Sequence, residues 1–272
     1  MKSATYIERL NRPLRTYAFL FLAFLYVPVL FLPLFSFNDS LYISFPLKAF
    51  TTKWYAQMFA DQPMHAALMN SLKVGGVTSV VATVLGIFGA KAVTRYRMPG
   101  KAPALFVIML PLVIPGIIMG VALLILISRM GIPLSLYTVT LGHIPVSVPF
   151  AMMTLMSRFE GFDRSMEEAA ADLGDNAWWT FWRVTFPIVF PGVLASLLLC
   201  FTISFDEFIM AFFLSGTEPT LPIFIYSQLR FPLKLPGVLA LGAIILMVSF
   251  IVVVFSQWLR RRGIDGASSS GL

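Results

Sequence analysis

Two adjacent acids, Asp206 and Glu207, are the residues of this sequence best placed to do chemistry, because apolar runs lie on both sides of them. A carboxylate at membrane depth costs about 2.5 to 3.5 kcal/mol on insertion scales, so an acid kept there is a candidate for a function. Thr202 lies one helical turn earlier on the face of Asp206. The pair predicts an acidic site for a cation; the alternatives are a solvated helix end and a salt bridge to a partner subunit.

No other group of side chains has the spacing of a catalytic or metal centre. Cys200 is the only cysteine, and the two histidines, His65 and His143, are far apart in the sequence. The chain has no glycine-rich phosphate loop, no His-Glu-x-x-His motif and no nucleophile elbow. Asp206 and Glu207 would point about 100° apart on a helix, which is unsuited to paired acid and base catalysis. We therefore expect no enzyme activity, no metal and no cofactor in this chain.

The polar stretch at residues 157–187 carries a short helix signal. Ser165 with Glu168 three residues later is a capping-box pattern, which predicts a helix over residues 166–173. Gly174 suits the end of that helix, and Arg164 can pair with Glu168 one turn away. The simplest interpretation is that Glu168 only caps this helix.

The same stretch also has the composition of a docking surface. Ala169 and Ala170, followed by Ala171, leave a smooth helical face on which another protein can rest. A second short helix is expected to begin near Asp175 or Asn176, and Pro187 is expected to mark the turn into the next apolar run. Three tryptophans fit an aromatic anchor at the membrane interface. They are Trp178, Trp179 and Trp182.

Composition shows that most of the chain must face lipid. Hydrophobic residues make up 58% of the 272 residues and charged residues only 12%, against about 45 to 50% and 25% in soluble domains. Six apolar runs are long enough to cross about 30 Å of hydrocarbon as helices. They are Tyr17–Phe35, Leu72–Val93, Ala102–Ile127, Leu134–Met156, Ile188–Phe205 and Pro236–Leu259.

The distribution of basic residues predicts the orientation. Fourteen of the 20 lysines and arginines lie in segments that share one side if the N-terminus is cytoplasmic, and six lie on the other side. We expect a basic cytoplasmic N-terminus (residues 1–16), a transmembrane domain (17–259) with a cytoplasmic loop at 157–187, and a cytoplasmic tail (260–272). Topology explains the net charge of +7, so no nucleic-acid partner is needed.

The loop resembles a family motif. Residues 168–170, Gly174 and Pro187 have the spacing of the Glu-Ala-Ala loop in permease subunits of binding-protein-dependent ABC importers. That motif reads E-A-A, three residues, G, nine residues, I, one residue, L-P. This sequence departs from it at Val184 and Phe186, both of which remain apolar.

Shorter blocks extend the resemblance along nearly the whole chain, and together they are similar to the polyamine-transporting branch, most of all to the putrescine permeases. The blocks are FTTKWY at residues 50–55, NSL at 70–72, RYRMPGK at 95–101, SRFEGFD at 157–163 and SFDEF at 204–208.

The resemblance implies an all-α integral membrane fold of the MetI-like type I importer class in the bacterial inner membrane. It implies three kinds of partner: a second homologous permease, an ATP-binding subunit dimer that holds ATP and Mg, and a periplasmic polyamine-binding protein. Glu168 would contact the ATPase, Ala169 and Ala170 would seat the helix, and Gly174 would allow its bend.

The resemblance also implies a small organic polycation as the substrate. Asp206 and Glu207 carry the matching charge, and Phe205 and Phe208 can contact the methylene chain or ammonium groups of a diamine. The alternative is a gradient-driven secondary transporter or channel for organic cations, which would have no use for a docking loop.

Overall fold

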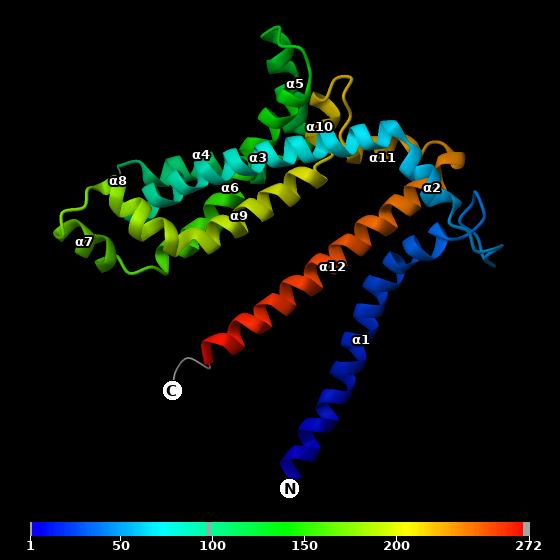
Figure 1. The fold of residues 1–272 in the computed structure, drawn as a ribbon, viewed down its shortest axis with the longest axis horizontal. Helices are drawn as coiled ribbons and strands as arrows, with labels where there is room; N and C mark the ends of the chain where they lie inside the picture. The colour runs from blue at the N-terminus through cyan, green and yellow to red at the C-terminus, as the bar shows by residue number, and fades with distance from the viewer. Residues whose placement is uncertain (1, 97–98, 269–272) are drawn as a thin grey trace. The chain divides into compact units, whose positions relative to one another are not determined.

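The computed structural model describes residues 2–96 and 99–268, and most of these residues are helical (Figure 1). Among the described residues, five helices are long and apolar enough to cross a membrane, and one bent pair makes a sixth span if it counts as one. The elements are α1 Lys2–Ser36, α2 Lys53–Ala60, α3 Gln62–Arg95, α4 Lys101–Val113, α5 Gly116–Arg129, α6 Leu136–Glu160, α7 Ser165–Asp172, α8 Ala177–Thr180, η1 Phe181–Thr185, α9 Phe186–Asp206, α10 Ile209–Leu214, α11 Leu221–Gln228, η2 Pro232–Lys234 and α12 Leu235–Ser268.

The described chain divides into two compact units. One unit is Pro63–Tyr226, which holds α3 to α10 and most of α11. The other unit consists of the chain on either side and contains α1, α2, η2 and α12.

In the unit with both terminal segments, α1 lies against α12 and exposes a long apolar surface. Gly242 of α12 faces Leu32 of α1, and a Cβ added to this glycine would lie 3.8 Å from the nearest leucine carbon. Phe19 and Phe24 of α1 are 71% and 77% exposed. A soluble protein rarely exposes so large an apolar surface, so lipid or a partner subunit must cover it.

The FTTKWY block folds the chain back after α1. The indole Nε1 of Trp54 donates a hydrogen bond to the Asn38 carbonyl oxygen at 2.9 Å. The hydroxyl of Tyr55 lies 2.6 Å from that of Ser36, the last residue of α1. The block therefore has a local structural role.

The unit Pro63–Tyr226 is built around α3, α6 and α9. Small residues on α3 allow close helix approach, as at Gly86, which meets Ala151 of α6. Thr83 of α3 and Ser196 of α9 share a buried hydrogen bond of 3.1 Å. Small and hydroxyl side chains thus join all three helices.

The third expected span is not one helix. It is split into α4 and α5, which meet at an angle of 104°. Ile114 precedes Pro115 and has the extended conformation that the proline ring imposes on its neighbour. Pro111 also lies within the last turn of α4 and removes a backbone donor there. The combined effect of the two prolines is a sharp break.

The fifth span was expected to begin at Ile188 after a turn at Pro187, and this was wrong. Residues 177–206 form one continuous helical segment of 30 residues through α8, η1 and α9. Within η1 the Phe186 N–H donates to the Phe181 carbonyl, which is a π-helical bond. This wider turn relieves the clash that Pro187 would cause with the carbonyl four residues earlier.

Several other spans extend beyond their apolar runs. Helix α3 begins at Gln62 and α12 continues to Ser268, although the sequence predicted Leu72 as a start and Leu259 as an end. Two residues of the RYRMPGK block, 97 and 98, and the end of the expected tail, 269–272, lie outside the described residues.

We predict that Gly86→Ala destabilises the protein, whereas Gly76→Ala on the same helix does not. A Cβ at Gly86 would lie 2.7 Å from the Ala151 Cβ, which cannot rotate away, so α3 and α6 must separate. Overpacking of this kind costs about 1 to 3 kcal/mol. At Gly76 no heavy atom lies within 4 Å, and alanine favours the helix. Thermal unfolding of the detergent-solubilised variants measures the difference; equal midpoints would contradict the prediction.

Candidate functional site

Asp163 supports the N-terminus of α7. Its carboxylate accepts a hydrogen bond from the Ser165 N–H at 3.0 Å. This bond, and a second one with the Ser165 side chain, lower the pKa of Asp163. Its contribution to stability is therefore present above the unfolded-state pKa of about 3.9 and is lost as the pH falls through the folded-state value. The expected capping box was wrong, because Ser165 already belongs to the helix.

Glu168 lies on the outer side of α7, where it pairs with Arg164 as expected. The Arg164 Nε lies 3.1 Å from the Glu168 Oε1, and the two side chains are 65% and 64% exposed. An exposed pair one turn apart contributes only about 0.3 to 0.5 kcal/mol. Glu168 can therefore exchange Arg164 for a basic group of another protein at little cost.

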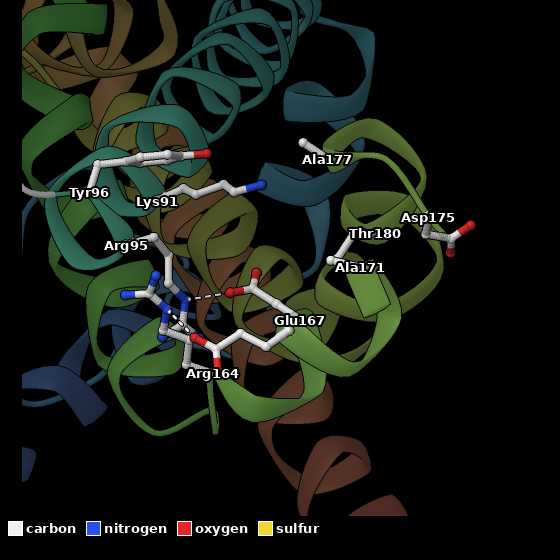
Figure 2. A pocket seen from close by; sticks show the side chains of 10 residues that line it. Lys91, Arg95, Tyr96, Arg164, Glu167, Ala171, Asp175, Ala177 and Thr180 are labelled. Carbon is white, nitrogen blue, oxygen red and sulfur yellow. Dashed lines mark ion pairs between the residues drawn. The ribbon is translucent and has the colours of Figure 1, made fainter. Parts of the chain in front are cut away.

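Glu167, which the sequence analysis did not single out, is far less exposed and points toward α3. Its Oε2 lies 3.0 Å from the Nε of Arg95 on α3. The Nε–H does not align with the carboxylate as a hydrogen bond requires, so this contact is a charge pair. The hydroxyl of Thr185 in η1 donates to the Glu167 Oε1 at 2.6 Å. Figure 2 shows Arg95 and Glu167 turned toward each other on the wall of a groove of about 320 Å³, which Arg164 and Glu168 also line.

The three alanines of α7 also divide between an inner and an outer side. Ala170 is buried, whereas Ala169 is exposed. Met166 and Leu173, which are 48% and 90% exposed, lie three and four residues from Ala169 and continue its side of the helix. We call the exposed residues Met166, Glu168, Ala169 and Leu173, which lie on more than one stripe of the helix, the outer face of α7. A face that combines apolar side chains with one carboxylate suits protein docking.

Gly174 ends α7 in the way expected of it. Its φ of +96° lies in the left-handed region, which favours glycine. The Gly174 N–H donates to the Ala171 carbonyl at 3.0 Å, and the Asp175 N–H donates to the Ala170 carbonyl at 3.1 Å. This pair of bonds is the Schellman motif. The chain then turns sharply into α8.

The start of α8 is capped by Asn176, as the sequence indicated. Its side-chain oxygen accepts hydrogen bonds from the N–H groups of Trp178 and Trp179 at 3.1 and 3.0 Å. The Trp178 and Trp182 rings meet edge to face at 5.7 Å, and all three tryptophans remain exposed. They are therefore free to contact the membrane interface.

The two acids at the end of α9 have different environments. The Glu207 carboxylate accepts hydrogen bonds from the N–H groups of Ile209, Met210 and Ala211 at 3.0, 2.8 and 3.3 Å, so it caps the start of α10. Asp206 is the last residue of α9 and is exposed. Only Asp206 keeps its carboxylate open to solvent or a ligand.

A buried histidine lies behind Glu207. The His143 Nδ1 is 2.7 Å from the Ser204 hydroxyl, and its Nε2 is 3.3 Å from the Glu207 Oε2 without hydrogen-bond alignment. His143 and Ser204 thus hold α6 against the end of α9.

The remaining residues of the expected pathway lie before and after the break between α9 and α10. Thr202 is exposed and its hydroxyl donates to the Leu198 carbonyl at 2.9 Å. Phe205 stacks on Phe201 with 5.7 Å between ring centroids. Phe208 packs against Tyr226 at 5.1 Å and is partly buried.

Comparison with known proteins identifies the family. Residues 82–264 match the family described as "Binding-protein-dependent transport system inner membrane component". The chain belongs to this family. It is therefore a multi-pass inner-membrane permease component of an importer.

Two polyamine permeases from Escherichia coli K12 are similar over most of this permease. The spermidine/putrescine permease PotC is 35% identical over 88% of this chain and 90% of its own length. The putrescine permease PotI is 33% identical over 88% of this chain and 87% of its own length. The identities to PotC and PotI are too similar to distinguish putrescine from spermidine as the substrate.

More distant relatives share the architecture with other substrates in their names. The molybdenum permease ModB of the same organism is 30% identical over 75% of this chain and 96% of its own. A solved bacterial importer of the polysaccharide alginate superposes with a TM-score of 0.68 at 18% identity, covering 96% of this chain and 98% of that one. The fold is the MetI-like permease fold of type I ABC importers.

Sequence reasoning missed Glu167, Arg95 and Thr185 because none of them carries an unusual signal alone. Glu167 adjoins the Glu-Ala-Ala motif and has the features of an ordinary solvated acid. Arg95 was considered only as a basic residue for topology and as the first residue of the RYRMPGK block. A helical projection of α7 would have shown Glu167 and Ala170 on one side, away from Glu168.

We predict that Glu207→Ala destabilises the permease and that Glu207→Gln does so much less. Alanine leaves three N–H groups of α10 without their acceptor, and loss of a side-chain cap costs about 0.5 to 2 kcal/mol. Glutamine keeps one oxygen acceptor. Thermal unfolding in detergent measures both variants, and equal losses for the two would show that the charge, rather than the cap, matters.

Proposed function

We propose that this permease is one of two membrane subunits of an ATP-driven importer of putrescine or a related polyamine. A second homologous permease completes the translocation pathway, and a dimer of cytoplasmic subunits binds and hydrolyses ATP with Mg. A periplasmic polyamine-binding protein delivers the substrate. The chain itself carries out no hydrolysis, and both of its termini are cytoplasmic, in agreement with the distribution of basic residues.

The outer face of α7 carries this proposal. The helix is fixed from behind by Glu167 and Ala170, while Glu168, Ala169 and Leu173 are exposed. A short helix held rigidly with an exposed apolar and acidic face is suited to a cleft with a basic residue in another subunit. We assign that cleft to the ATPase. Gly174 and the helix that contains Pro187 then connect the docking helix to the membrane span.

A polyamine is supported by charge and by similarity. Asp206 offers an open carboxylate at the end of α9, and the exposed Thr202 lies one turn before it. Phe205 and Phe208 adjoin the acid and provide aromatic surfaces for an ammonium group or a methylene chain. Glu207 is occupied with α10, so we assign it to shaping the site. The relatives PotC and PotI are named for polyamines.

The experiment that tests the proposal is reconstitution of the complete complex in proteoliposomes. We expect uptake of radiolabelled putrescine or spermidine that requires ATP inside the vesicle and the binding protein outside. Uptake by the permease alone down a gradient, without ATP, would instead support the secondary-transporter alternative, against which family membership already argues.

Asp206→Asn should lower polyamine uptake about tenfold while leaving assembly intact, because it removes the charge that faces the cation. Glu218→Gln is the matched control, since Glu218 is an exposed acid in the loop after α10. Initial uptake rates at equal amounts of assembled complex give the comparison. Unchanged uptake in Asp206→Asn would remove this acid from the pathway.

Glu168→Ala should weaken ATPase stimulation by the binding protein about tenfold, because the outer face of α7 loses its charge. Glu160→Ala, an exposed acid at the end of α6, should leave stimulation unchanged. Hydrolysis is measured in proteoliposomes with and without the loaded binding protein. Full stimulation in the Glu168 variant would exclude it from the docking contact.

A further inference from the structure

Three separate elements meet at one carboxylate, that of Glu167. The acid belongs to α7, its ionic partner Arg95 is the last residue of α3, and its hydrogen-bond donor Thr185 is the last residue of η1. The distances to these two partners are 3.0 and 2.6 Å. No motif of the Glu-Ala-Ala loop includes this junction.

The junction is much less exposed than the pair of Arg164 with Glu168 on the same helix. The Arg95 and Glu167 side chains are 11% and 15% exposed, against 65% and 64% for Arg164 and Glu168. Water and salt screen a partly buried pair far less than an exposed one. The contact that holds α7 from behind is therefore stronger than the contact on its outer face.

Arg95 also fixes the chain that leads into α7. Its Nη2 donates a hydrogen bond to the Phe162 carbonyl at 3.1 Å, and its guanidinium lies 4.9 Å from the centre of the Phe162 ring. Phe162 itself is buried. Movement of α7 must therefore pull on the end of α3 or break these contacts.

Thr185 connects the junction to a membrane span at a place where the helix can change register. The residue is fully buried, and it is the last residue of the π-helical segment η1. Short π segments are less stable than α-helix and often mark functional positions. Helix α9 begins at the next residue and leads through 21 residues, about 31 Å, to Asp206.

We propose that Glu167 is the positioning residue that transmits movement of α7 to α3 and to α9. In this arrangement Glu168 faces the ATPase and Glu167 faces the membrane helices, so α7 works as a link between the two. This inference rests on the proposed function. The inference adds to the proposed function a specific residue, Glu167, whose partners are Arg95 and Thr185. Loss of the link leaves ATP hydrolysis without the corresponding transport.

The test is Glu167→Gln in the complete complex, reconstituted in proteoliposomes. Glutamine keeps the size and the acceptor for Thr185 but loses the charge that holds Arg95. We expect the number of polyamines transported per ATP hydrolysed to fall about tenfold, within the usual range of coupling between sites. A change that merely destabilised the protein would lower the amount of complex and leave this ratio unchanged.

Two further variants sharpen the result. Arg183→Gln breaks an exposed ion pair of the same loop, with Asp175 at 3.0 Å, and should keep the wild-type ratio. The double variant Arg95→Glu with Glu167→Arg restores opposite charges, so it should recover part of the ratio that Glu167→Gln loses. Failure of the double variant to exceed Glu167→Gln would contradict the charge pair as the link.

The outcomes separate this inference from the proposed function. A wild-type complex without ATP-driven polyamine uptake overturns the proposed function. A wild-type complex that transports, together with a Glu167→Gln variant of unchanged ratio, overturns only the link. If Glu167→Gln fails to assemble, the Thr185→Val variant tests the inference instead, because valine keeps the shape of threonine and removes the hydroxyl that donates to Glu167. An unchanged ratio in that variant overturns the inference, and a fall of about threefold supports it.

Discussion

The first N–H groups of a helix have no partner within that helix, and this constraint governs which residues precede several of the helices of the permease. At three helix ends a side chain replaces the missing backbone partner. Asp163 does so before α7, Asn176 before α8 and Glu207 before α10. The breaks are thus places where polar side chains are required, and the residues that could do chemistry collect there.

These breaks lie at the two ends of the same membrane span. Helix α9 starts at the junction of Glu167 with Thr185 and ends at Asp206, about 31 Å away. The π-helical segment at its start lets it continue past Pro187 without a turn. One continuous helical segment therefore connects the loop that we propose as the docking element with the exposed Asp206. Such a segment is a suitable element for coupling the two, since a helix transmits displacement along its axis with little loss.

Adjacent residues of the same chemical type take opposite roles throughout this site. In each pair one residue is bound within the fold and the other is exposed. For the two pairs on α7 the reason is that neighbours on a helix point about 100° apart, whereas Glu207 has left the helix that Asp206 ends. The inner members hold the elements in place, and the outer members are available to partners or substrate. The pairs are Glu167 with Glu168, Ala170 with Ala169, and Glu207 with Asp206.

The sequence by itself determined the family, the number of apolar runs, the end of α7 at Gly174 and the pair of Arg164 with Glu168. These features depend on local composition and short spacing, which a sequence displays directly. Only the tertiary structure decided that the third span is broken by 104° and that Glu167 binds Arg95. Arg95 and Glu167 are 72 positions apart in the chain, and no local pattern specifies which distant side chain will lie opposite a given acid when the helices pack.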